Sequence, residues 1–234
     1  MKGGVIAIDG PSASGKSSTA RAVAEALGFA HLDSGALYRG VTLVALREAR
    51  RDGVEGDPLV LGAEAILRAA EDRGLMLQPD GAGFAAYLDG EPVDAALRDA
   101  DVTRHVSAVS AVPVVREWVN ARLRQLVRAG RDVVVDGRDI GTVVFPDADL
   151  KVFLTATPEA RAGRRLSQRG ERIVPEELDR EAAALSRRDV ADSSRAVAPL
   201  RRADDAVDLD TTGMTFAEGV AWILARARAA LARR

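Results

Sequence analysis

The chain has 234 residues, of which 47% are hydrophobic and 29% charged, with a net charge of −2 at neutral pH and no cysteine. A chain of this length and composition supports one large core, so we expect a single α/β domain carrying excursions rather than two independent folds. The lack of cysteine excludes disulfides, thiolate metal sites and cysteine nucleophiles. The balanced charge excludes a nucleic-acid partner held by bulk positive charge.

Short apolar runs alternate with helical patterns along most of the chain. Such runs are typical of buried parallel strands, and the sequence predicts them at residues 5–9, 29–33, 132–136, 150–154 and 206–210. Helical spacing and cap residues predict helices over 16–27, about 36–50, 59–73, 114–128, 158–169, 176–190 and 216–234. Ser34 is the predicted cap of the second helix.

The pattern changes character after the helix at 59–73. Three short segments, 75–78, 85–88 and 91–93, are separated by two Asp-Gly pairs, which favour tight hairpins. They predict a small antiparallel β meander inserted into the α/β scaffold. The predicted fold class is therefore a three-layer, doubly wound, five-stranded parallel sheet of the P-loop NTPase type, with an insert at about 40–100 and a mobile lid at about 158–195.

A glycine-rich loop follows the first predicted strand and precedes the first predicted helix. It matches the pattern G-x-x-x-x-G-K-[ST], whose backbone N–H groups cradle phosphates while the lysine reaches the β/γ-oxygens and the hydroxyl ligates Mg²⁺. A chance Gly/Ser turn is the alternative, but spacing and context both favour phosphate binding. The residues of this predicted site are Gly10, Pro11, Ser12, Ala13, Ser14, Gly15, Lys16, Ser17 and Ser18.

Charged residues follow two other predicted strands. Loops at the carboxyl ends of parallel strands converge on one crevice, so Arg39, Arg138 and Asp139 are expected near Lys16. Residues 158–202 also hold eleven arginines against eight acidic residues, whereas 48–101 hold five against thirteen. Several arginines converging on a phosphate loop indicate a second phosphate.

Five segments together resemble the bacterial cytidylate kinases. They are the loop at Gly10, the stretch from Leu32 to Arg39, the pair of blocks at Val112-Pro113 and Arg116-Glu117, the block from Asp136 to Asp147, and the stretch from Arg188 to Leu200. The block at Asp136 is far more specific than the phosphate loop. The resemblance covers nearly the whole chain, is vague at about 48–100 and 167–180, and implies transfer of the γ-phosphoryl group of ATP, with Mg²⁺, to CMP or dCMP.

The resemblance also implies roles for individual residues. Ser34, Ser107, Arg116 and Asp139 would lie around the cytosine, Arg39 and Arg138 would hold the acceptor phosphate, and Arg188 with Asp192 would meet the ribose. Arg195, Arg161 and Arg165 would belong to the lid over the transferring group, the last two on the ATP side. Lys16, Arg138 and Arg195 would be catalytic and Ser17 the metal ligand.

Several alternatives stay open at the level of sequence. Tyr38 either packs beside the acceptor or in the core, and Asp136 is either an outer-sphere partner of Mg²⁺ or a helix N-cap. The acceptor could instead be UMP, AMP or a shikimate-like molecule, or the chain could be a regulatory nucleotide-binding module. A GTP switch is not supported, because no Asn-Lys-x-Asp motif is found. We expect a cytoplasmic monomer with small-molecule nucleotide partners and no membrane partner, since no segment reaches membrane-spanning length.

Overall fold

The computed structural model describes residues 3–54, 56–128 and 130–233. It divides the chain into two compact units, the first formed by residues 1–32 and 127–234 and the second by residues 33–126. The insert predicted at about 40–100 falls inside the second unit. Each unit has its own architecture.

The first unit is built on five strands: β1 (Val5–Asp9), β2 (Ala30–Asp33), β6 (Val133–Gly137), β7 (Leu150–Thr155) and β8 (Val207–Asp210). Their order in the sheet is β2-β6-β1-β7-β8, and β1 pairs in parallel with both β6 and β7, as β7 does with β8. Every residue of β1 and β6 is buried, as expected for the centre of a parallel sheet. The predicted fold class is confirmed.

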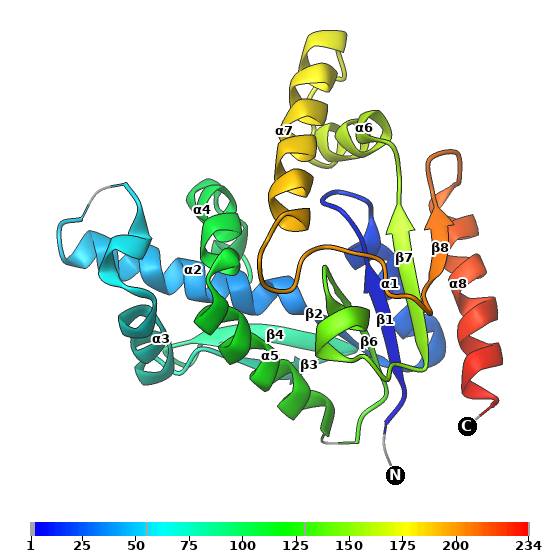
Figure 1. The fold of residues 1–234 in the computed structure, drawn as a ribbon, viewed down its shortest axis with the longest axis horizontal. Helices are drawn as coiled ribbons and strands as arrows, with labels where there is room; N and C mark the ends of the chain where they lie inside the picture. Colours follow the sequence, from blue (N-terminus) through cyan, green and yellow to red (C-terminus); the bar gives the residue numbers. More distant parts are fainter. Residues whose placement is uncertain (1–2, 55, 129, 234) are drawn as a thin grey trace. The chain divides into compact units, whose positions relative to one another are not determined.

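Two helices form the core of the first unit with this sheet. The helices α1 (Lys16–Leu27) and α8 (Phe216–Leu231) run beside β1, β7 and β8 (Figure 1). Their apolar residues Val23, Ile223 and Ala227 join Ile6 and Leu154 of the strands in one fully buried cluster. Such packing of helix on sheet removes apolar surface from water and fixes the carboxyl ends of the strands, where the predicted site lies. The last predicted residue of the closing helix, Arg234, lies outside the described residues.

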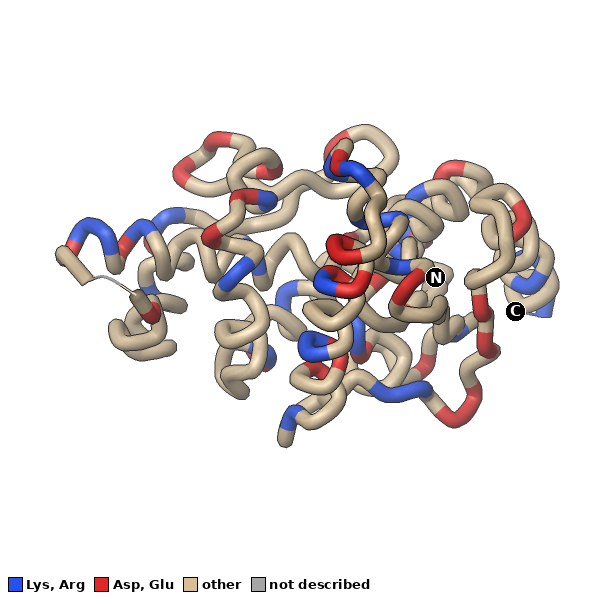
Figure 2. Tube along the Cα trace, turned by 90° about the horizontal axis from the view of Figure 1, so that it is seen from above, with Lys and Arg blue, Asp and Glu red and all other residues tan. Residues whose placement is uncertain are grey.

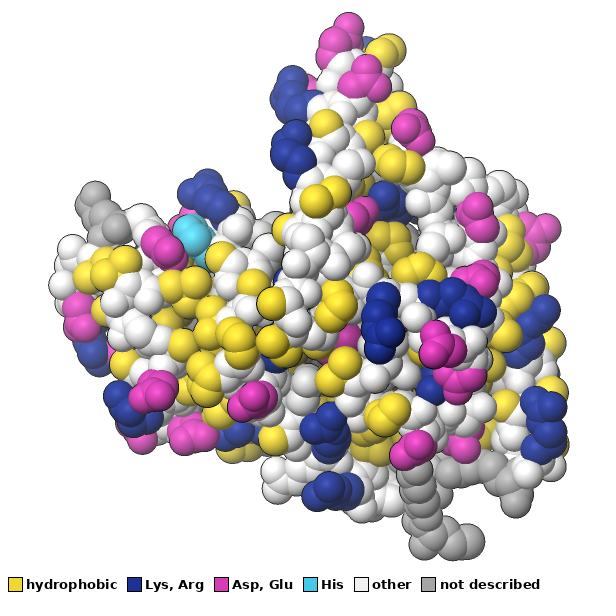
Figure 3. Space-filling view, viewed as in Figure 1, with side chains coloured by type: hydrophobic (Ala, Val, Ile, Leu, Met, Phe, Trp, Pro, Cys, Tyr) yellow, Lys and Arg dark blue, Asp and Glu magenta, His cyan; other side chains and the backbone are white. Residues whose placement is uncertain are grey.

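Two further helices of the first unit lie beyond the carboxyl end of β7, and Figure 1 shows them packed together. They are α6 (Pro158–Gln168) and α7 (Pro175–Ser193), and the short π-helical turn η3 (Ile140–Val144) follows β6. In the space-filling view α7 forms a column with basic side chains along one flank and acidic side chains at its tip (Figure 3). The two helices are separated by a loop at residues 169–174.

The second unit contains the predicted meander. Its strands β3 (Met76–Asp80), β4 (Gly83–Leu88) and β5 (Glu91–Pro92) pair in antiparallel fashion. The helices of this unit are α2 (Ser34–Arg51), α3 (Ala63–Asp72), α4 (Ala100–Ala111) and α5 (Pro113–Arg128), with the short 3-10 turns η1 (Pro58–Leu61) and η2 (Ala96–Arg98). The end of α5 passes into the first unit.

Two local predictions in the second unit are wrong. The helix predicted over 59–73 is interrupted at Gly62, whose φ of 80° is not helical. The cap of α2 is Asp33 rather than Ser34: the Asp33 side chain accepts a hydrogen bond from the Gly35 N–H at 2.8 Å, and Ser34 is already the first helical residue. Both side chains can cap a helix, and the extended backbone at Asp33 decides between them.

Candidate active site

The glycine-rich loop occupies the predicted place between β1 and α1. Gly10 is required there because a Cβ atom at this position would lie 2.1 Å from the Leu154 carbonyl oxygen on the neighbouring strand. Ala13 has a left-handed backbone with φ 58°, which helps successive N–H groups turn toward one side of the loop. The Lys16 ammonium group donates to the Pro11 carbonyl at 2.9 Å and is buried. The loop therefore has the geometry of a phosphate cradle closed by its own lysine.

A chain of polar side chains joins this loop to the end of β6: Asp136 and His31 are buried, and Ser17 is exposed. The Ser17 hydroxyl donates to Asp136 Oδ2 at 2.5 Å, and His31 Nε2 lies 2.8 Å from Asp136 Oδ1. Asp136 lies inside β6 and its side chain contacts the first turn of α1. The alternative interpretation of Asp136 as a helix N-cap is therefore wrong.

The Asp9 carboxylate holds the start of η3. Its two oxygens accept hydrogen bonds from the Ile140 N–H at 2.8 Å and the Gly141 N–H at 2.7 Å. Burial raises the pKa of the Asp9 carboxyl to about 6, although these two hydrogen bonds act in the opposite direction. Asp9 thereby fixes the backbone that follows Arg138 and Asp139. Asp9 is not among the residues predicted from the sequence, where its only signal is its place directly before the phosphate loop.

Two arginines of α6 donate hydrogen bonds to backbone carbonyls of the phosphate loop. Arg161 donates to the Ser12 carbonyl at 2.9 Å, and Arg164 donates to the Ser14 carbonyl at 3.2 Å. Arg165, the predicted ATP-side residue, forms an ion pair with Glu181 of α7 at 3.1 Å. The structure thus brings Arg161 to the loop, places Arg165 between α6 and α7, and adds Arg164, which sequence analysis missed among eleven arginines of similar setting.

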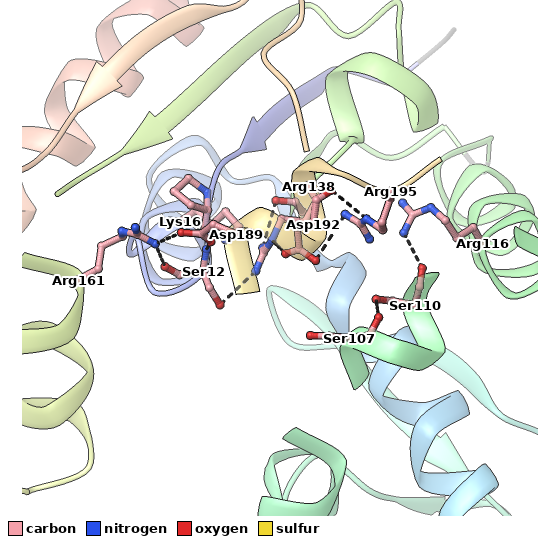
Figure 4. Close-up of polar contacts among 12 residues, drawn as sticks. Ser12, Lys16, Ser107, Ser110, Arg116, Arg138, Arg161, Asp189, Asp192 and Arg195 are labelled. Carbon is pink, nitrogen blue, oxygen red and sulfur yellow. Dashed lines mark hydrogen bonds and ion pairs between the residues drawn. The ribbon is translucent and has the colours of Figure 1, made fainter. Parts of the chain in front are cut away.

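The end of α7 brings the predicted Arg138, Asp192 and Arg195 together, as Figure 4 shows. Arg138 Nε donates to Asp192 Oδ2 at 2.9 Å, and Arg195 Nε donates to the Asp192 carbonyl at 3.0 Å. Burial alone would raise the pKa of the Asp192 carboxyl, but Arg138, Arg195 and Arg188 around it lower that pKa below its usual range. Asp192 is therefore a carboxylate that orders the surrounding arginines.

Asp139 lies at the start of η3 and is 3% exposed. Its carbonyl accepts hydrogen bonds from the N–H groups of Val143 at 2.9 Å and Val144 at 3.1 Å. The backbone of Asp139 is thereby fixed by η3 on one side and by β6 on the other.

The second unit holds the other predicted acceptor residues. Arg116 is 2% exposed, donates to the Ser110 carbonyl at 3.0 Å and lies 5.2 Å from the centre of the Tyr38 ring. Tyr38 is buried, so both interpretations of it are compatible with its position. The Ser107 carbonyl accepts from the Ser110 hydroxyl at 3.1 Å, which places Ser107 one turn from the Arg116 contact.

Arg39 and Ser34 belong to the first turns of α2. Arg39 Nη1 donates to the Leu97 carbonyl at 2.9 Å and to the Thr103 hydroxyl at 3.0 Å. Ser34 is buried at the start of the helix. The second unit thus gathers Tyr38 with Arg116, whereas Arg39 is held by η2 and α4.

Basic and acidic residues are interspersed along the trace (Figure 2). Within the part of the chain that the structure describes, no helix is both long and apolar enough to cross a membrane.

A parallel sheet with a phosphate loop between β1 and α1, and with arginines gathered at the carboxyl ends of its strands, defines an α/β P-loop nucleotide-binding protein. Comparison with known proteins makes this more specific. Residues 6–229 match the family described as cytidylate kinase, and the chain belongs to this family.

Curated relatives agree with the family match. A cytidylate kinase of Streptomyces griseus is 46% identical over 214 residues, which cover 91% of this chain and 87% of that protein. A cytidylate kinase of Rhodococcus opacus is 47% identical over 209 residues, covering 89% and 87%. Among solved structures, an uncharacterized protein from Eubacterium ventriosum is similar with a TM-score of 0.51 over 97% of this chain and 99% of that chain, at 11% identity. This last likeness shows the fold alone.

Proposed function

We propose that the chain transfers the γ-phosphoryl group of ATP to CMP or dCMP, giving ADP and CDP or dCDP. The observation that carries this proposal is the match to the cytidylate kinase family over residues 6–229. It includes the phosphate loop and the block from Asp136 to Asp147, and the named relatives are 46% and 47% identical. A kinase with another acceptor, or a regulatory module, has no comparable support.

On the donor side, the phosphate loop and Lys16 would bind the ATP phosphates. Lys16 stabilises the charge that develops on the oxygens around the transferred group, because a fixed cation in a water-poor site needs no reorganisation during the reaction. Arg161 and Arg164 support this side through the loop carbonyls they contact. Arg165 and Arg195 are the arginines that would close over the phosphates from α6 and the end of α7.

The oxygen atoms of Ser17 and Asp136 fit a magnesium ion. A hydroxyl and a carboxylate 2.5 Å apart at a loop edge are hard oxygen donors, and Mg²⁺ typically takes one or two such protein ligands together with substrate phosphates. Among the described residues no group of three or more His, Asp or Glu side chains could hold a metal by itself, which agrees with a site completed by the nucleotide. When bound, the ion neutralises phosphate charge.

On the acceptor side, the phosphate of CMP would be bound by Arg138 and Arg39 and its ribose by Asp192 and Arg188. One of the ionised phosphate oxygens attacks the γ-phosphorus, so the protein has to orient it rather than deprotonate it. Asp139 would accept from the N4 amino group of cytosine. The remaining residues proposed around the acceptor are Ser34, Tyr38, Ser107 and Arg116.

A coupled assay of ADP release tests this function. With Mg²⁺-ATP and a panel of CMP, dCMP, UMP, AMP and shikimate, we expect ADP to form only when an acceptor is added, and fastest with CMP or dCMP. Slow ADP release that is independent of any acceptor would favour the regulatory module. A preference for another acceptor would overturn the cytidylate assignment.

A further inference from the structure

Ser12 of the phosphate loop is contacted through three different groups. Its N–H donates to Asp189 Oδ1 at 3.0 Å, its carbonyl accepts from Arg161 Nη1 at 2.9 Å, and its hydroxyl accepts from Arg138 Nη2 at 3.3 Å. Ser12 itself is 3% exposed. A loop residue held by its N–H, its carbonyl and its hydroxyl has little freedom to move independently of the elements that hold it.

Helix α7 links the Asp189 contact of Ser12 to the Arg138 contact, because Asp189 and the Asp192 partner of Arg138 both lie on this helix. Asp189 and Asp192 are three positions apart, so they lie on the same side of the helix. Asp189 Oδ2 accepts from Arg161 at 2.5 Å, and Asp192 Oδ2 accepts from Arg138 at 2.9 Å. The hydrogen bonds therefore close a ring that runs from Ser12 to Asp189, along one turn of α7 to Asp192, and through Arg138 back to Ser12 (Figure 4).

The ring contains one ion pair, Arg138–Asp192, and a second, Arg161–Asp189, lies beside it; their side chains are largely shielded from water. The side chains of Arg161 and Asp192 are 5% and 7% exposed, and those of Asp189 and Arg138 are 17% and 19% exposed. Charges in such a setting are costly to leave unpaired, so the members keep their partners when one of them is displaced. A shift of Ser12 is consequently transmitted to Arg138 both directly and through α7.

We propose that Ser12 and Asp189 are positioning residues that couple the occupation of the donor loop to the orientation of Arg138 on the acceptor side. The inference rests on the proposed function, in which the loop binds ATP and Arg138 binds the phosphate of CMP. Binding of ATP phosphates fixes the loop and, through the ring, Arg138, so the acceptor meets an arginine that is already ordered. Each substrate then raises the affinity for the other by the same factor.

Calorimetry can measure this coupling in the full chain. The dissociation constant of CMP is determined without ligand and with saturating Mg²⁺ and a non-hydrolysable ATP analogue, and the ratio of the two values is the coupling factor. For the wild type we expect a factor of about five or more, the lower end of usual allosteric coupling. In Ser12→Ala, which removes only the contact with Arg138, and in Asp189→Asn, we expect it to fall to within about twofold of one.

Two comparisons separate positioning from loss of structure. The double variant Ser12→Ala with Asp189→Asn should lose no more coupling than either single variant, because both act in one ring. Asp205→Asn is the matched control: it removes a carboxylate that pairs with Lys151 at 2.8 Å in the same unit but outside the ring, and it should keep the wild-type factor. If circular dichroism shows that Asp189→Asn is unfolded, the coupling factor of Ser12→Ala alone tests the inference.

The inference and the proposed function fail in different ways. A wild type that phosphorylates CMP but shows no coupling, or variants that keep the wild-type factor, would overturn the inference alone. An equal loss in Asp205→Asn would also overturn it. A wild type that neither binds nor phosphorylates CMP would overturn the proposed function and the inference with it.

Discussion

The Ser17 hydroxyl donates to the Asp136 carboxylate at 2.5 Å, so the first turn of α1 is joined to the end of β6. This contact places a phosphate-loop hydroxyl and a strand-end carboxylate where a magnesium ion carried by ATP would need oxygen donors. It also gives Asp136, 2% exposed, a polar partner in addition to His31, and so explains how a carboxylate is tolerated in a buried strand.

Asp136→Asn should weaken the binding of Mg²⁺ in the nucleotide complex. The amide keeps the shape of the side chain but removes the negative charge, so the Mg²⁺ concentration for half-maximal activity should rise about tenfold or more. Calorimetry of ADP binding with Mg²⁺ and with EDTA gives a second readout: affinity should fall with Mg²⁺ and change little in EDTA. Asp205→Asn serves as the control variant. Equal losses of ADP affinity with and without Mg²⁺ would mean that Asp136 has a structural role and does not bind the metal.

Lys16→Met should lower kcat by about 10² or more while the protein stays folded. The methionine fills much of the buried volume of the lysine stem and lacks the ammonium group that donates to the Pro11 carbonyl. Steady-state kinetics and thermal unfolding measure the two effects separately. A variant that keeps most of its turnover would remove Lys16 from the mechanism.

Asp9 should make the free energy of unfolding depend on pH. Its pKa is about 6 in the folded protein against an ordinary value of 3.8, so between these values the folded state holds a proton that the unfolded state has lost. Stability therefore falls as the pH rises through this window, by about 3 kcal/mol in all, of which roughly half lies between pH 5 and 7.5.

Urea unfolding of the nucleotide-free protein at several pH values checks this dependence. Asp9→Asn does not titrate, so the stability of the wild type minus that of the variant should decrease from pH 5 to pH 7.5. The variant also loses one of the two hydrogen bonds from Ile140 and Gly141, which shifts its stability at all pH values. A constant difference between the two proteins would contradict the raised pKa.

The sheet and the phosphate loop could be predicted from the sequence because their signals are local. An apolar run such as Val133–Val135 is short, β-branched and flanked by turn residues, which favours a buried strand over a helix, and the loop motif lies between such a strand and a helical pattern. The N-cap of α2 could not be chosen from the sequence, because Asp33 and Ser34 are adjacent and both are good caps.

The ring around Ser12 could not be predicted, because it depends on long-range packing. Ser12 and Asp189 are 177 positions apart, and nothing in the local pattern of α7 indicates that this carboxylate faces the loop. The spacing of Asp189 and Asp192 shows only that they share a side of the helix. In the same way, Arg161, Arg164 and Arg165 have similar sequence settings, and only the fold distinguishes those that contact the loop from the one that pairs with Glu181.

Arg138→Ala and Arg188→Ala should each impair catalysis with CMP much more than they impair ATP binding, because their proposed contacts lie on the acceptor. Calorimetry with each nucleotide alone checks this: we expect the CMP affinity to fall about tenfold or more and the ATP affinity to change by less than about threefold. Arg187→Ala, at the exposed neighbour of Arg188 on α7, is the matched control. Equal losses of affinity for ATP and CMP would mean that these residues do not act specifically on the acceptor.

Asp139 should determine the choice of base. Cytosine presents an N4 amino donor that a carboxylate can accept, while Arg116 would donate toward N3 or O2. Uracil turns its O4 acceptor toward the carboxylate and its N3–H toward the guanidinium, which leaves buried polar groups unpaired at about 1–3 kcal/mol each. The value of kcat/KM should therefore be about ten- to a thousandfold higher for CMP than for UMP.

Asp139→Asn should narrow this gap, since the amide can turn its N–H donor toward O4 of uracil. The measurement is kcat/KM for CMP and UMP in both proteins, with thermal unfolding to show that the buried position, 3% exposed in the wild type, tolerates the amide. A general loss of activity with an unchanged ratio would mean that Asp139 supports the backbone of η3 without reading the base. Equal activity of the wild type on both nucleotides would leave the choice of CMP resting on family membership alone.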